Sequence, residues 1–112
     1  MLSRDDVDMT RALERGDAPA GGFPHASHLR VAWVYLEESS TIDEAIARMR
    51  DTLRRFASSV GQADKYSEPV TVFWMLQLAA ARAVMPAHAT IDDVLRAYPR
   101  LLDKHLIRAN VA

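Results

Sequence analysis

The stretch from residue 23 to residue 36 decides the fold, and it reads Phe-Pro-His-Ala-Ser-His-Leu-Arg-Val-Ala-Trp-Val-Tyr-Leu. On a helical wheel at about 100° per residue, five of its apolar residues fall on one side. They are Leu29, Ala32, Trp33, Tyr35 and Leu36. His25 and His28 fall on that same side, and polar residues such as Arg30 and Glu37 fall opposite. The pattern predicts a buried helix that opens with two histidines facing the protein interior.

Two interpretations of this histidine pair stay open at the level of sequence. Both rings are core residues satisfied by hydrogen bonds, or both belong to a polar site. Ala32 lies one turn beyond His28, and Tyr35 lies about one turn further on. A small residue between a histidine and a tyrosine leaves room for a ligand.

Length and composition exclude several classes of function. The 112 residues fit one domain, spanning residues 1–112, with 49% apolar and 26% charged residues. The net charge of −1 and the lack of a basic cluster disfavour a nucleic-acid partner. Without cysteine there is no disulfide, thiolate metal site or cysteine nucleophile. The N-terminus is unlike a signal peptide, and the apolar run at 70–85 is too short for a bilayer. We therefore expect a cytoplasmic protein with no membrane partner.

Helix signals cover most of the chain. Ser3 is placed to cap a first helix that ends near Gly16, and a Gly- and Pro-rich loop follows at 16–24. Thr41 and Glu44 fit a capping box for a third helix that ends at Gly61. The apolar residues of that helix alternate in steps of four and three, and they are Ile42, Ile46, Met49, Leu53, Phe56 and Val60. Its charged outer face is interpreted as solvated.

The second half of the chain predicts one long helix and one or two short ones. Ser67 and Pro69 place the start of the long helix near Glu68. From residue 70 to 85 it is apolar on almost every side, so it is either central or covered by a partner. Pro86 ends it, Thr90 caps a helix over 91–98, and a short helix follows Pro99. The fold class is therefore all-α, a single-domain bundle of four main helices plus one or two short C-terminal helices.

Short connections make sequential helices antiparallel, so the helices that begin near residues 25 and 68 start at the same end of the bundle. We expect His25 and His28 to meet polar residues of the second start there. These are Lys65, Tyr66, Ser67, Glu68 and Thr71. Trp33, Trp74 and Tyr35 are expected to wall the resulting cavity.

Such a cluster suits either of two chemistries. His25, His28 and Glu68 together resemble a two-histidine, one-carboxylate set for a divalent metal. Without a metal, the same three groups and Tyr66 are candidates for proton transfer, with Lys65 and Tyr66 binding an oxyanion. Two helix N-termini favour an anion and keep nearby histidines neutral. The alternative role for Glu68 is stabilisation of its own helix dipole. A divalent metal and no cofactor are equally compatible with the sequence.

The two motifs, Phe-Pro-His-Ala-Ser-His-Leu-Arg-Val-Ala-Trp and Lys-Tyr-Ser-Glu-Pro-Val-Thr, resemble those of a group of small bacterial all-helical proteins of uncharacterised activity. The group's pattern is Phe-x-His-x-x-His-(Leu/Val)-Arg-x-Ala-Trp followed by Lys-(Tyr/Phe)-His-Glu-Thr-(Ile/Val)-Thr. The resemblance covers over half of the chain. Ser67 stands where the group has histidine, and Pro69 where it has threonine. If the group's third histidine is a ligand or an acid–base residue, this chain has an altered chemistry or a binding role.

Three hypotheses on function follow. The first is a small enzyme of specialised metabolism, a lyase, isomerase or cyclase with or without a metal, that moves protons in the pocket. The second is a non-catalytic pocket that binds a small ligand, either anionic or uncharged. The third is an interaction module whose apolar helix at 68–85 packs in a homodimer or against a larger enzyme. The expected partners are a small-molecule ligand or substrate and, for the third hypothesis, a second copy of the chain.

Overall fold

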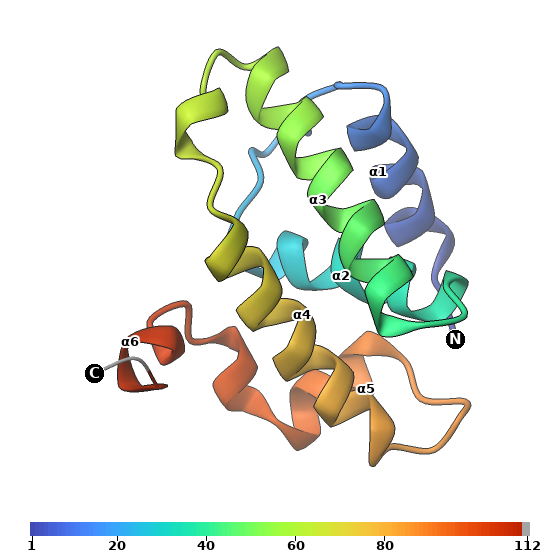
Figure 1. Ribbon diagram of the computed structural model, residues 1–112. Helices are drawn as coiled ribbons and strands as arrows, with labels where there is room; N and C mark the ends of the chain where they lie inside the picture. The colour runs from blue at the N-terminus through green and yellow to red at the C-terminus, as the bar shows by residue number, and fades with distance from the viewer. Residues whose placement is uncertain (111–112) are drawn as a thin grey trace.

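The computed structural model describes residues 1–110, and that part of the chain contains helices, turns and loops but no strand (Figure 1). This confirms the all-α class. The α-helices are α1 Arg4–Glu14, α2 His25–Glu38, α3 Ile42–Ser59, α4 Glu68–Ala83, α5 Ile91–Ala97 and α6 Leu106–Asn110. Two short 3₁₀ helices, η1 Ala63–Lys65 and η2 Pro99–Leu102, lie between them.

Local side-chain chemistry determines where these helices begin. The hydroxyls of Ser3, Thr41, Ser67 and Thr90 each accept a hydrogen bond from the backbone N–H three residues later. These four predicted caps are confirmed. At α3 the expected capping box differs in one bond, because the Glu44 carboxylate accepts from the N–H of Ser40. The complete capping box is instead at the start of α5.

Helix α2 crosses the middle of the molecule, packed against α1, α3 and α4 (Figure 1). Every residue from Val31 to Leu36 on it is buried. Polar links fix its neighbours in place. The Tyr35 hydroxyl donates to Glu14 of α1 at 2.7 Å and lies 2.5 Å from the hydroxyl of Thr52 of α3. Arg30 pairs with Asp6 of α1 at 3.0 Å and also with Asp92 of α5.

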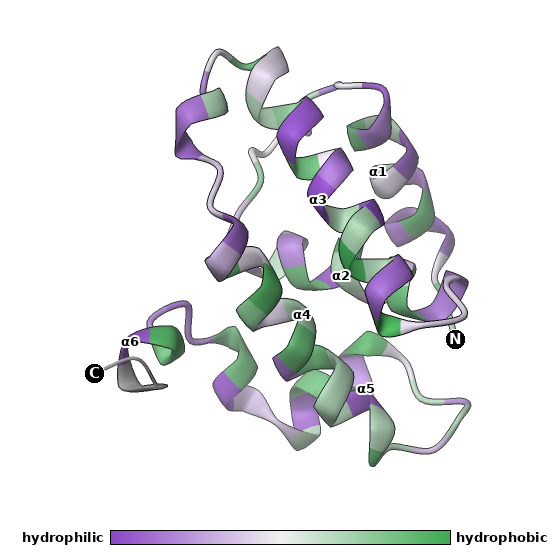
Figure 2. Cartoon of the chain, viewed as in Figure 1, coloured by the Kyte–Doolittle hydropathy of each residue, from purple (hydrophilic) through white to green (hydrophobic). Residues whose placement is uncertain are grey.

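Helix α4 is an outer helix, although its sequence is apolar on almost every side (Figure 2). Thr71, Met75 and Leu78 face inward and are buried. Val70 is 42% exposed and Leu76 is 47% exposed, so α4 is not central. Whether a partner covers this face stays a prediction. Within the described part of the chain, none of the helices has the length and apolar character needed to cross a bilayer.

The C-terminal segment folds back beside α4 (Figure 1). Helix α5 ends at Ala97. The single short helix expected after Pro99 is two separate turns, η2 and α6, joined at residues 103–105. Leu101 is buried in the core, whereas Leu102 is 48% exposed.

Candidate functional site

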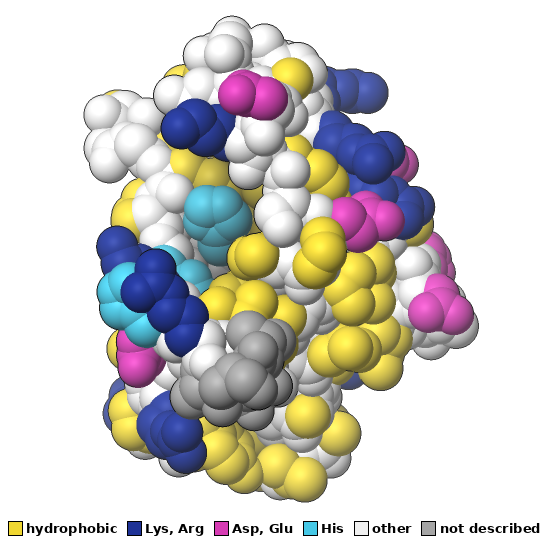
Figure 3. All heavy atoms as spheres, turned by 60° about the vertical axis from the view of Figure 1, so that its left-hand side comes forward, with side chains coloured by type: hydrophobic (Ala, Val, Ile, Leu, Met, Phe, Trp, Pro, Cys, Tyr) yellow, Lys and Arg dark blue, Asp and Glu magenta, His cyan; other side chains and the backbone are white. Residues whose placement is uncertain are grey.

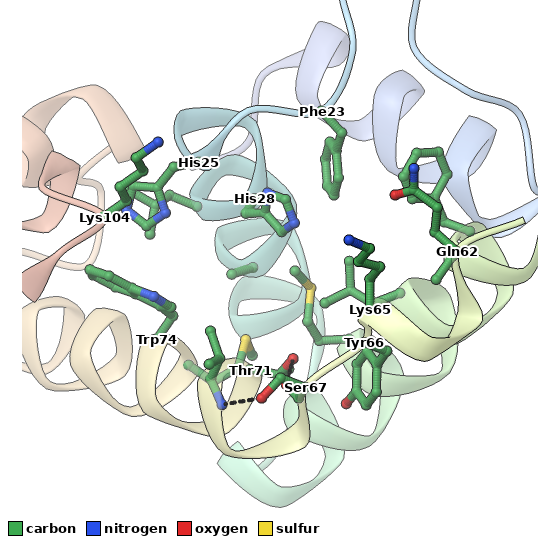
Figure 4. A pocket seen from close by; sticks show the side chains of 18 of the residues that line it. Phe23, His25, His28, Gln62, Lys65, Tyr66, Ser67, Thr71, Trp74 and Lys104 are labelled. Atoms are coloured by element: carbon green, nitrogen blue, oxygen red, sulfur yellow. Dashed lines mark hydrogen bonds between the residues drawn. The ribbon is translucent and has the colours of Figure 1, made fainter. Parts of the chain in front are cut away.

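A pocket of about 530 Å³ lies between the N-terminal ends of α2 and α4 and the C-terminal half of α3 (Figure 4). The expected convergence of the two helix starts is therefore present. The predicted residues that line the pocket are His25, His28, Lys65, Tyr66, Ser67, Thr71 and Trp74. On the face shown in Figure 3, histidine side chains lie at a hollow with cationic side chains nearby.

His25 connects the first turn of α2 to the C-terminal segment. Its Nε2 lies 2.8 Å from the carbonyl oxygen of Leu101 in η2, and the ring nitrogen is the donor. The ring also lies against Trp74, with centroids 4.3 Å apart. One nitrogen of His25 therefore has a structural role, and the ring holds Trp74 at the edge of the pocket.

His28 is held differently, and its second nitrogen is unused. Nδ1 donates to the carbonyl oxygen of Pro24 at 3.1 Å, and the ring lies 3.9 Å from the ring of Phe23, centroid to centroid. Because Nδ1 carries the proton in the neutral ring, Nε2 carries the lone pair. Nε2 has no hydrogen-bond partner within residues 1–110.

The environment of His28 favours its neutral form. Burial lowers the pKa of the imidazole, and the nearby His25 lowers it further, against the opposing effect of the bond to Pro24. The ordinary pKa of histidine is about 6.5. A lower pKa leaves His28 uncharged at neutral pH, with the basic lone pair at the pocket.

Tyr66 and Glu68 form a pair at the start of α4. The Tyr66 hydroxyl donates to Glu68 Oε1 at 3.1 Å, and the guanidinium of Arg54 lies 5.3 Å from the Tyr66 ring centroid. Burial, and then the hydrogen bond and charge of Glu68, raise the pKa of Tyr66 against opposing effects of Thr71 and Arg54. Tyr66 therefore stays protonated at neutral pH.

The expected metal-binding set of His25, His28 and Glu68 does not assemble. Glu68 does not line the pocket, because its Oε2 lies 3.6 Å from Arg50 of α3 and its Oε1 is bonded to Tyr66. Across the residues that the structure describes, no three histidine, aspartate or glutamate side chains are grouped as metal ligands. The charged face of α3, expected to be solvated, thus supplies in Arg50 a cation that competes for Glu68.

Trp33 and Tyr35 also lie outside the pocket. The Trp33 indole donates to the carbonyl oxygen of Met1 at 3.3 Å, and Tyr35 is bonded to Glu14 and Thr52. Helix α2 is enclosed on several sides, so a position on the apolar side of the wheel does not identify which cavity a residue reaches. Of the three predicted aromatic walls, Trp74 alone lines the pocket.

The remaining lining comes from residues that sequence reasoning assigned to the core or did not single out. Met49, Leu53 and Phe56 belong to the apolar stripe of α3, which here forms the pocket wall. Phe23 comes from the loop before α2 and Lys104 from the segment after η2. The stripe itself was visible in the sequence. Lys104 gave no signal, because its position depends on how the C-terminal segment folds back.

Comparison of the chain with family models, with curated proteins and with solved structures finds no match. The resemblance to small bacterial helical proteins stays a prediction.

Proposed function

We propose that the protein binds a small organic molecule in the pocket between α2, α3 and α4. The observation that supports this most directly is a cavity of about 530 Å³ with a mainly apolar wall and a few polar groups at its edge. Pockets that hold small ligands have volumes of roughly 300–1,000 Å³ and this kind of lining. The floor consists of buried Leu29, Met49 and Met75, and the unbonded Nε2 of His28 adds a polar anchor.

A titration with the uncharged fluorophore N-phenyl-1-naphthylamine tests this binding function. We expect a saturable increase in fluorescence at one molecule per chain. Ala57 lines the pocket from α3, and Ala47 is a half-buried residue of the same helix that does not line it. Ala57→Phe should abolish the increase, and Ala47→Phe should preserve it. Equal binding by both variants, or no binding by the parent protein, contradicts the proposal.

Proton transfer by His28 is a second candidate function, supported by the fixed ring of that residue. The bond to Pro24 sets the tautomer, and the lowered pKa keeps Nε2 available as a base. This retains the enzyme hypothesis in a narrower form, a lyase, isomerase or cyclase step with one base. Glu68 has no role in this proton transfer, because it does not line the pocket.

The ring opening of 5-nitrobenzisoxazole reports a base in an apolar pocket, because it begins with removal of one carbon-bound proton. A positioned base contributes about 10²–10⁴-fold to such a step. We expect the His28→Gln variant to react no faster than free imidazole at the same concentration. His105→Gln, at an exposed residue that does not line the pocket, serves as the control. Equal rates in parent protein and His28→Gln would exclude His28 as a base.

A further inference from the structure

The pocket-lining side chains that are charged at neutral pH, Lys65 and Lys104, are both cations. Four basic side chains line the pocket, and they are His25, His28, Lys65 and Lys104. No aspartate or glutamate is among the lining residues within the described chain. Glu68 does not line the pocket: its Oε2 lies 3.6 Å from Arg50, and its Oε1 accepts a hydrogen bond from Tyr66.

Both lysines of the chain line the pocket, although arginine is the far commoner basic residue. The chain has twelve arginines but only two lysines, Lys65 and Lys104, which are 39 positions apart in sequence. Both line this pocket. Most of the arginines are paired with carboxylates across the surface, whereas neither lysine has an ion pair with another described residue. Two unpaired ammonium groups therefore stand at one cavity.

Depth separates the charged and the apolar parts of the pocket. Lys65 and Lys104 are exposed, so their ammonium groups lie at the rim. Leu29 and Met75 are each 1% exposed and form the deep wall. Figure 4 shows Lys104 beside His25 on one side and Lys65 on the other side of His28. A ligand that satisfies both parts has an apolar body and an acidic group at one end.

We propose that the pocket selects an organic anion with an apolar body, because the charges of Lys65 and Lys104, on two sides of the rim, attract its acidic group. This rests on the proposed binding function and adds the charge of the ligand to it. Lysine acts as a point charge on a flexible stem, so it tolerates acidic groups of different geometry. The apolar body lies against the methionine, leucine and phenylalanine side chains of α3 and α4.

A matched series of probes with the same carbon skeleton tests the charge preference. We would measure the affinities of 4-phenylbutyrate, 4-phenylbutan-1-ol and 4-phenylbutylamine by calorimetry in the parent protein and in a double variant with Lys65→Met and Lys104→Met. Methionine keeps much of the length of lysine and removes the charge. Arg4→Met, which removes one exposed cation that does not line the pocket, controls for the loss of a surface charge elsewhere.

We expect the double variant to lose about fivefold or more in its ratio of acid to alcohol affinity, since exposed ion pairs each contribute modestly. The affinity of the double variant for the amine should rise. Arg4→Met should change neither the ratio of acid to alcohol affinity nor the affinity for the amine. If all three probes bind with affinities that the lysines do not affect, the charge preference is wrong while the binding function stands. If none of the three binds, and N-phenyl-1-naphthylamine does not bind either, the binding function is wrong as well.

Discussion

Replacing Ala32 with leucine tests whether the space beside His28 is an open pocket. Ala32 lines the pocket from α2 and is 2% exposed. The substitution adds three carbon groups, each about the size of a water molecule, which occupies about 30 Å³ in the liquid. The added volume of about 90 Å³ fits within the cavity of about 530 Å³.

The expected change in the free energy of unfolding follows from burial of these three carbon groups. Each buried carbon group contributes about 0.8 kcal/mol, so the upper limit is about 2.4 kcal/mol. Ordering the leucine side chain costs about 0.5–1 kcal/mol. We therefore expect the free energy of unfolding to rise by about 1–2 kcal/mol or to stay unchanged, while binding of N-phenyl-1-naphthylamine is lost.

Ala45→Leu is the matched control, because Ala45 is fully buried in α3 and does not line the pocket. Overpacking at such a site costs about 1–3 kcal/mol. Urea unfolding followed by circular dichroism compares the two variants. If Ala32→Leu destabilises the protein as much as Ala45→Leu does, or leaves dye binding intact, the pocket argument fails.

Two further predictions concern the packing of α2 and the protonation of His28. Tyr35→Phe removes the hydroxyl that bonds Glu14 and Thr52, and should lower the free energy of unfolding by about 1–3 kcal/mol in urea unfolding. Tyr98→Phe, at a residue that is 40% exposed, should change it by less than about 0.5 kcal/mol, and a comparable loss would contradict the role of the buried hydroxyl. Because the folded-state pKa of His28 is lowered, the unfolded chain takes up the proton first, and stability falls as pH drops below about 6.5. Urea unfolding at pH 7.5 and pH 5 should show a smaller loss for His28→Gln than for the parent protein, and an equal loss would contradict the lowered pKa.

The sequence predicted those features of the fold that depend on neighbouring residues. Ser67 and Pro69 placed the start of α4 at Glu68, since capping and the geometry of proline act within one turn. The meeting of the α2 and α4 starts followed from connection lengths alone. That is why His25, His28 and the segment 65–67 could be assigned to one pocket before their contacts were known.

Features that depend on charged residues distant in sequence, and on how the C-terminal segment folds back, could not be predicted from neighbouring residues. Glu68 could be assigned to the helix start but not to Arg50, because that pairing depends on how α3 and α4 are rotated against each other. Trp33 and Tyr35 lie on the expected side of α2, yet they contact Met1, Glu14 and Thr52. When a helix is buried on several sides, its apolar pattern no longer shows which neighbour or cavity a given residue contacts.

Methionine methyl NMR with 4-phenylbutyrate tests the proposed ligand site most directly. Two of the five methionines, Met49 and Met75, line the pocket, whereas Met1, Met9 and Met85 do not. In protein labelled with ¹³C at the methionine methyl groups, addition of 4-phenylbutyrate should shift the Met49 and Met75 signals and leave the other three in place. Shifts at Met9 or Met85 in place of Met49 and Met75, or no shift at a concentration that calorimetry shows to be saturating, would contradict a ligand site between α2, α3 and α4.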